Sequence, residues 1–169
     1  KLPESDVILI SDYGKGVVTP ALIRRAAAGA DACGRIAVAD PKGLDFSKYA
    51  GLSMLTPNQK EAALAAGLDI TDEDSLIRAA GRILQTSGVR NLLVTRGKDG
   101  MMLFQEGEAP YAIPSQARQV YDVSGAGDTV LSVLGLGVAA GLSFREAAEM
   151  ANTAAGIVVG KVGTATVTP

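Results

Sequence analysis

Short apolar runs alternate with segments of helix length along this 169-residue chain, and this alternation restricts the fold more than any other feature. An uninterrupted apolar run is typical of a strand buried on both faces of a parallel sheet. Strands that alternate with helical segments indicate a sheet with helices on both faces. We therefore expect an α/β fold of three layers with a mostly parallel sheet. The runs are Val7–Ile10, Ile36–Ala39, Ser53–Leu55 and Asn91–Val94.

Proline and capping signals predict where the helices begin. Thr19-Pro20 has the pattern of an N-cap followed by the first helical position, and we expect the same opening at Thr56-Pro57. Ser143 with Glu146 three residues later is a capping box. The other predicted elements are a helix over residues 71–87, a hairpin over 101–105 and 110–113, and helices over 127–140 and 143–159.

Polar side chains follow each predicted strand. Taken singly, each cluster is typical of an ordinary loop or of a solvated first helical turn. Because ligands of open α/β sheets bind beyond the carboxyl ends of the strands, their shared position favours a site. Lysines suit phosphates, and one or two carboxylates suit a hydrated Mg²⁺, which together are the groups that phosphoryl transfer needs. The clusters are Asp12 with Lys15, Asp40 with Lys42, Asn58 with Glu61, and Thr95 with Gly97.

The segment Gly125-Ala126-Gly127-Asp128 opens an apolar helical run. Its glycines permit a sharp turn, and the unpaired N–H groups of a helix start attract anionic oxygens. Asp128 beside such a pocket has two interpretations of equal weight. It can take a proton from an attacking hydroxyl, or it can merely complement the helix dipole. The segment is not a dinucleotide fingerprint, since position 130 is Val130. Gly156 to Gly160 is not a Walker loop, since only three residues separate the glycines and Val162 follows Lys161.

Composition excludes several classes of function. The chain has no histidine, so triads and metal sites that depend on histidine are excluded. Cys33 is the only cysteine, which excludes an internal disulfide and suits a reducing cytoplasm, where we expect the protein. With a net charge of −2 and no basic stripe, nucleic acid is not an expected partner. The longest uncharged run, between Asp128 and Arg145, is too short for a membrane span.

Four motifs in order resemble the ribokinase family of carbohydrate kinases, also called the phosphofructokinase-B group. The match covers nearly the whole chain and implies a ribokinase-like fold and an ATP-dependent sugar kinase that uses Mg²⁺. The motifs are the signature Asp122–Thr129, the Asn-x-x-Glu segment Thr56–Glu61, the strand and turn Val94–Gly100, and the late helix Ala151–Gly156.

The resemblance also implies roles for individual residues. Asp128 corresponds to the catalytic base, and the N–H groups of Gly125, Ala126 and Gly127 correspond to the anion hole. The residues implied at the nucleotide site are Asn58, Gln59, Lys60, Glu61, Thr95, Gly97 and Asn152. Glu61 is also expected to hold Mg²⁺ through water. The weaker candidates for contacts with the phosphorylated sugar are Asp12, Lys15, Asp40 and Lys42.

A narrower resemblance is to the members of this family that phosphorylate D-glycero-β-D-manno-heptose 7-phosphate. It implies formation of the 1,7-bisphosphate in ADP-heptose and lipopolysaccharide core biosynthesis, often within a bifunctional enzyme. The segments that carry this resemblance are Ser11–Gly16, Asp40–Gly43, Val120–Gly125 and Val158–Thr164.

Residues 1–169 resemble only the C-terminal half of these kinases. We expect one partial domain that holds the ATP and catalytic side and lacks the N-terminal sugar-binding strands and lid. The chain alone should therefore show at most traces of kinase activity. An exposed sheet edge should also favour self-association, and a homodimer is the expected assembly.

Other interpretations stay open at this point. The ATP-side motifs do not separate heptose phosphate from another sugar or a nucleoside as the acceptor. A nucleotide-binding fragment without turnover is a second alternative. A dinucleotide-dependent oxidoreductase has the right fold class but lacks the fingerprint.

Overall fold

The computed structural model describes residues 4–117 and 121–161 of the chain. Six strands form one sheet in the order β1-β2-β3-β4-β5-β6. Strands β1 to β4 are parallel, and β5 and β6 continue the sheet antiparallel to their neighbours. The mostly parallel sheet and the hairpin are thus confirmed. The strands are β1 (Val7–Ser11), β2 (Ile36–Asp40), β3 (Met54–Leu55), β4 (Asn91–Thr95), β5 (Met101–Gln105) and β6 (Tyr111–Ile113).

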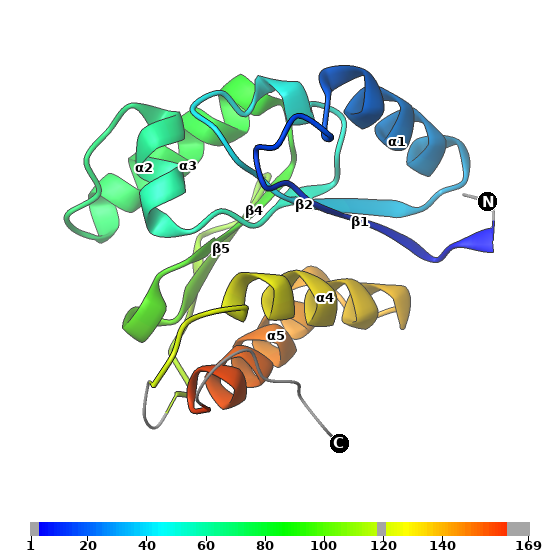
Figure 1. The fold of residues 1–169 in the computed structure, drawn as a ribbon. Helices are drawn as coiled ribbons and strands as arrows, with labels where there is room; N and C mark the ends of the chain where they lie inside the picture. The colour runs from blue at the N-terminus through cyan, green and yellow to red at the C-terminus, as the bar shows by residue number, and fades with distance from the viewer. Residues whose placement is uncertain (1–3, 118–120, 162–169) are drawn as a thin grey trace.

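Helices cover both faces of this sheet, so the expected three layers are confirmed (Figure 1). Helices α1, α2 and α3 lie on one face, and α4 and α5 pack together on the other. Within the described ranges, no helix is both long enough and apolar enough to cross a membrane. The helices are α1 (Pro20–Ala32), α2 (Gln59–Ala66), α3 (Glu73–Ser87), α4 (Ala126–Ala139) and α5 (Phe144–Val159).

The alternation of side chains along the strands explains why their apolar runs are continuous. In β2, Ala37 and Ala39 belong to the core under α1–α3, whereas Val38 belongs to the core under α4 and α5. In β4, Leu92 and Leu93 divide between the two cores in the same way. Because successive residues of a strand point to opposite faces, a strand between two helical layers needs an apolar residue at every position.

The helix-start signals are confirmed in part. The Thr19 side chain accepts a hydrogen bond from the Leu22 N–H at 3.2 Å, as expected of an N-cap before Pro20. The expected opening at Thr56-Pro57 is wrong, since α2 begins at Gln59 and its N-cap is Asn58. The backbone before Asn58 stays extended because neighbouring strands use it. The Thr56 N–H donates to the carbonyl of Ala39 at 2.9 Å.

Strand β1 lies at one edge of the described sheet and pairs with β2 alone. None of its five residues is fully buried. An open strand edge of this kind offers unpaired backbone groups to another strand. Self-association through it stays a prediction. Val120 and Val162–Thr164, which complete two of the sequence motifs, lie outside the described residues.

Candidate active site

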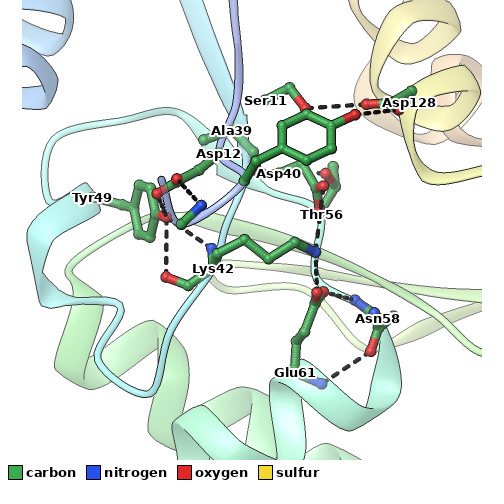
Figure 2. A network of polar contacts seen from close by, with 12 residues as sticks. Ser11, Asp12, Ala39, Asp40, Lys42, Tyr49, Thr56, Asn58, Glu61 and Asp128 are labelled. Atoms are coloured by element: carbon green, nitrogen blue, oxygen red, sulfur yellow. Dashed lines mark hydrogen bonds and ion pairs between the residues drawn. The ribbon is translucent and has the colours of Figure 1, made fainter. Parts of the chain in front are cut away.

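The carboxyl ends of β1 to β4 bring the predicted polar clusters to one edge of the sheet. Ser11, the last residue of β1, pairs in register with Asp40, the last residue of β2. Asn58 forms an isolated bridge with Thr95 at the end of β4. The charges of Lys42, Glu61 and Asp128 all act on the pKa of Asp40, so these groups share one electrostatic environment. Figure 2 shows this network.

Asp128 is the third residue of α4, and its side chain points at the end of β1. Its two carboxylate oxygens accept hydrogen bonds from the Ser11 hydroxyl at 3.0 Å and the Tyr13 hydroxyl at 2.7 Å. In α2, α3 and α5 the side chain at the corresponding position completes a capping box with the N-cap. In α4 the N-cap is Gly125, which has no side chain, and no such box forms. Asp128 therefore serves a contact across the fold, which argues against a purely capping role.

The anion pocket expected at the start of α4 stays a prediction, but the structure shows which backbone N–H groups could form it. Gly125 has a φ of +78°, a left-handed conformation that favours glycine. The Ala126 N–H donates to the Val123 carbonyl at 3.2 Å, because the chain makes a turn there, so it does not point freely at a ligand. The N–H groups of Gly125 and Gly127 have no acceptor within the described residues. A side chain atom added at Gly127 would meet nothing within 4 Å, so the helix start is open on that side.

Lys42 links the ends of β2 and α2. Its ammonium forms an ion pair with Glu61 and lies 3.8 Å from an oxygen of Asp40. Burial acts to lower the pKa of Lys42, but Glu61, Asp40 and Asp128 outweigh burial and raise it, so the ammonium stays charged. Figure 2 shows the Lys42 side chain extending towards Glu61. In this conformation Lys42 neutralises the carboxylates of Glu61 and Asp40. Its contact with phosphate oxygens stays a prediction.

Burial raises the pKa of Asp40 from its ordinary value of 3.8 to about 6. Lys42 acts against this shift, while the negative charges of Glu61, Asp128 and Asp12 add to it. A carboxyl whose pKa is this high changes its charge close to neutral pH. Such perturbed groups are common at functional sites.

Asp12 is buried, at 2% exposure, and it accepts three hydrogen bonds. Its oxygens accept from the Lys48 ammonium at 2.7 Å, the Tyr49 hydroxyl at 2.6 Å and the Gly14 N–H at 2.8 Å. Burial acts to raise the pKa of Asp12, but these three hydrogen bonds outweigh it and the pKa is lowered. Asp12 therefore stays ionised and is turned away from Asp128. Lys48 and Tyr49 belong to the 3-10 helix η2 (Ser47–Tyr49).

The remaining candidates lie at several places. Thr95 ends β4, and Gly97 follows it on the surface with a φ of +59°. Asn152 is buried in α5 and its amide donates to the Pro114 carbonyl at 2.8 Å. The Gln59 amide donates to the Ile70 carbonyl at 3.2 Å, away from the Asp128 contacts. Lys15 and Lys60 are exposed and form no ion pair with the described residues.

Four residues of this cluster were not singled out as site residues from the sequence: Ser11, Tyr13, Lys48 and Tyr49. For Ser11 and Tyr13 the sequence did contain a signal. They flank Asp12 at the end of a strand, where side chains alternate, so both are expected on the face opposite to Asp12. For Lys48 and Tyr49 no signal was available. Tyr49 lies 37 residues from its partner Asp12, in a loop without a motif.

The sequence profile described as "pfkB family carbohydrate kinase" matches residues 3–169. The chain belongs to this family. This pfkB family chain is 55% identical over 167 residues to the "Bifunctional protein HldE" of Desulfatibacillum aliphaticivorans. It is 51% identical over 164 residues to the protein of the same name from Geobacter sulfurreducens.

The matched regions cover 99% and 97% of this chain but 34% of each of those relatives. The chain thus spans about a third of the length of the curated relatives it matches. Among solved structures, Arabidopsis thaliana ribokinase complexed with ribose and ATP aligns with a TM-score of 0.84 at 23% identity. Escherichia coli phosphofructokinase-2 in complex with potassium aligns with a TM-score of 0.79 at 20% identity. The alignments cover 96% and 94% of this chain and 52% of each kinase, and they establish the ribokinase-type fold.

Proposed function

We propose that the protein containing these residues is an ATP-dependent kinase that phosphorylates D-glycero-β-D-manno-heptose 7-phosphate at its anomeric oxygen. The observation that carries the proposal is the direction of Asp128. In this pfkB family chain, the Asp128 carboxylate does not cap its own helix α4. It faces Ser11 and Tyr13 at the end of β1, and it lies beside the N–H groups proposed to bind an anion. The narrower choice of acceptor rests on the heptose-kinase motifs and on the relatives named HldE, at 51% and 55% identity.

The chemistry assigned to Asp128 is proton transfer. The acceptor hydroxyl oxygen forms a bond to the γ-phosphorus of ATP as its proton passes to the Asp128 carboxylate. The bond between the γ-phosphorus and the bridging oxygen breaks, and ADP leaves with that electron pair. The N–H groups of Gly125 and Gly127 are placed to stabilise the negative charge that develops on the transferred phosphoryl group. The groups proposed for the nucleotide phosphates are Lys42, Asn58 and Glu61, with Thr95, Gly97 and Asn152 further along the nucleotide.

The residues present fit Mg²⁺ only as an ion that the nucleotide brings with it. No group of three His, Cys, Asp or Glu side chains in the described ranges is placed to hold a metal. Mg²⁺ in kinase sites usually keeps several waters and takes one or two carboxylates plus substrate phosphates. Glu61 provides one such carboxylate, now paired with Lys42, and we propose that it would hold the ion through water. The ion, when bound, neutralises charge on the phosphates.

We further propose that residues 1–169 form the nucleotide and catalytic portion of one longer kinase domain. The chain's coverage of about half of each solved kinase supports this. Kinase assays therefore require the full-length natural protein in which these residues occur, with the 169-residue chain measured in parallel. Kinase turnover by the shorter chain is expected to be at trace level.

Changing Glu61 tests the nucleotide site without touching the proposed base. In calorimetric titration with a non-hydrolysable ATP analogue, Glu61→Gln should weaken Mg²⁺-dependent binding about tenfold, because a neutral amide attracts the hydrated ion poorly. Glu146→Gln is the matched control, since Glu146 completes the same capping box on α5, away from the site. Equal affinity in both variants would show that Glu61 only caps α2 and pairs with Lys42, and that it does not hold the ion.

A further inference from the structure

The side chains of Ser11, Asp12 and Tyr13 point alternately to the two faces of the sheet. Along β1, Ile8 and Ile10 pack against the core under α1–α3. Leu9 lies on the opposite face, where an atom added at Gly135 of α4 would meet it at 2.5 Å. Because the alternation of an extended strand continues past its end, Asp12 faces η2 and its two neighbours face α4.

On the side of the segment that faces α4, Ser11 and Tyr13 hold both oxygens of the Asp128 carboxylate. The Ser11 hydroxyl donates to Oδ1 at 3.0 Å and the Tyr13 hydroxyl donates to Oδ2 at 2.7 Å. Two donors on different oxygens restrict rotation of the carboxylate about its bond to Cβ. Each oxygen keeps a second lone pair, so the carboxylate can still receive a proton. The contact with Asp128 raises the pKa of the Tyr13 phenol, which therefore remains a donor at neutral pH.

The other side of the segment is fixed to η2. Asp12 is buried and accepts from Lys48 at 2.7 Å and from the fully buried Tyr49 at 2.6 Å. Tyr49 in turn accepts from the Lys42 N–H at 2.8 Å, so the same cluster fixes the backbone that carries Lys42. A buried carboxylate with three donors allows little movement of the residues beside it.

We propose that Ser11 and Tyr13 are positioning residues that hold the Asp128 carboxylate towards the acceptor hydroxyl, and that the Asp12–Lys48–Tyr49 cluster anchors them. The inference rests on the proposed function of Asp128 as the base. It replaces the expected sugar contact of Asp12 with an anchoring role. A base held in place before the substrate arrives needs no reorganisation in the transition state.

The test removes one hydroxyl from the full-length protein. Tyr13→Phe keeps the ring and should lower kcat about tenfold, while KM for ATP changes less than about twofold. In the Asp128→Asn background, where the carboxylate is already lost, adding Tyr13→Phe should lower the residual rate by less than about twofold. Ser11→Ala should behave in the same way. Tyr111→Phe is the matched control, because Tyr111 lies on β6, at the opposite edge of the sheet from β1, and donates to the Glu149 carboxylate at 2.6 Å. Its turnover should equal that of the wild type.

The outcomes separate this inference from the proposed function. If the wild type turns over, Asp128→Asn does not, and Tyr13→Phe and Ser11→Ala keep wild-type kcat, the inference is overturned and the function stands. Multiplicative losses in the double variant, or a loss confined to KM for ATP, also overturn it, since they mean that Tyr13 does not act through Asp128. If the wild type transfers no phosphate to any sugar, the proposed function and the inference fail together.

Discussion

Asp128→Asn should lower kcat of the full-length protein by about 10² to 10⁴-fold and leave affinity for ATP within about twofold of the wild type. The amide has nearly the shape of the carboxylate but cannot accept the proton of the attacking hydroxyl. The proton moves only in the transition state, so the substitution should lower kcat and leave nucleotide binding nearly unchanged. Steady-state kinetics and titration with an ATP analogue measure the two quantities separately.

Asp72→Asn is the control for the loss of a carboxylate at a helix start. Asp72 caps α3 through the Ser75 N–H, and asparagine caps as well as aspartate does. Its turnover should match that of the wild type. If Asp128→Asn also retained wild-type turnover, Asp128 would be no more than a partner of Ser11 and Tyr13, and the proposed mechanism would be wrong.

Asp40→Asn should change how stability depends on pH. The pKa of Asp40 is about 6 in the folded chain and ordinarily 3.8, so the folded state binds this proton more tightly than the unfolded state. The resulting stabilisation is complete below pH 3.8 and is lost as the pH rises through about 6. A shift of about two pKa units corresponds to about 3 kcal/mol in the free energy of unfolding. Relative to the wild type, Asp40→Asn should therefore gain up to about 3 kcal/mol between pH 4 and pH 7.5.

Urea unfolding at a series of pH values measures this difference. Asp45→Asn is the control, because hydrogen bonds from Ser47 lower the pKa of the exposed Asp45. Its stabilising contribution is lost only as the pH falls through that lowered pKa, so its difference from the wild type should stay constant between pH 5 and pH 7.5. A constant difference between Asp40→Asn and the wild type over the same range would mean that burial does not raise the pKa of Asp40.

The strands and layers were predictable because burial leaves a local record in the sequence. A strand between two helical layers must be apolar at successive positions, and Ile36–Ala39 and Asn91–Val94 show this directly. Capping at Thr19 and Ser143 was predictable for a similar reason, since the donor and acceptor lie within three residues of each other.

The start of α2 was not predictable from local signals. Thr56 has the residue type of an N-cap, but its N–H is taken by Ala39 of the adjacent strand. Whether a neighbouring strand uses a backbone group depends on the sheet register, which a capping pattern does not contain. The helix therefore begins later, at Gln59, after the next residue able to cap, which is Asn58.

The location of the candidate site was predictable from the sequence, but its contacts were only partly so. The topology of a parallel sheet places strand ends together, so Asp40, Asn58 and Asp128 were expected at one edge. The partners of Asp128 lie 117 and 115 residues away, and no spacing rule connects them. Asp12 had the residue type of a substrate contact, but its burial against Tyr49 depends on how a distant loop packs.

The most direct test of the account is a coupled assay of ADP release by the full-length protein. It would be run with D-glycero-β-D-manno-heptose 7-phosphate, fructose 6-phosphate, ribose and a ribonucleoside as acceptors. We expect turnover with the heptose phosphate, kcat/KM for it at least about a hundredfold above the others, and loss of turnover in Asp128→Asn. Preference for another acceptor would place the protein elsewhere in the pfkB family. Absence of ADP release with every acceptor would contradict the proposal that it is a sugar kinase.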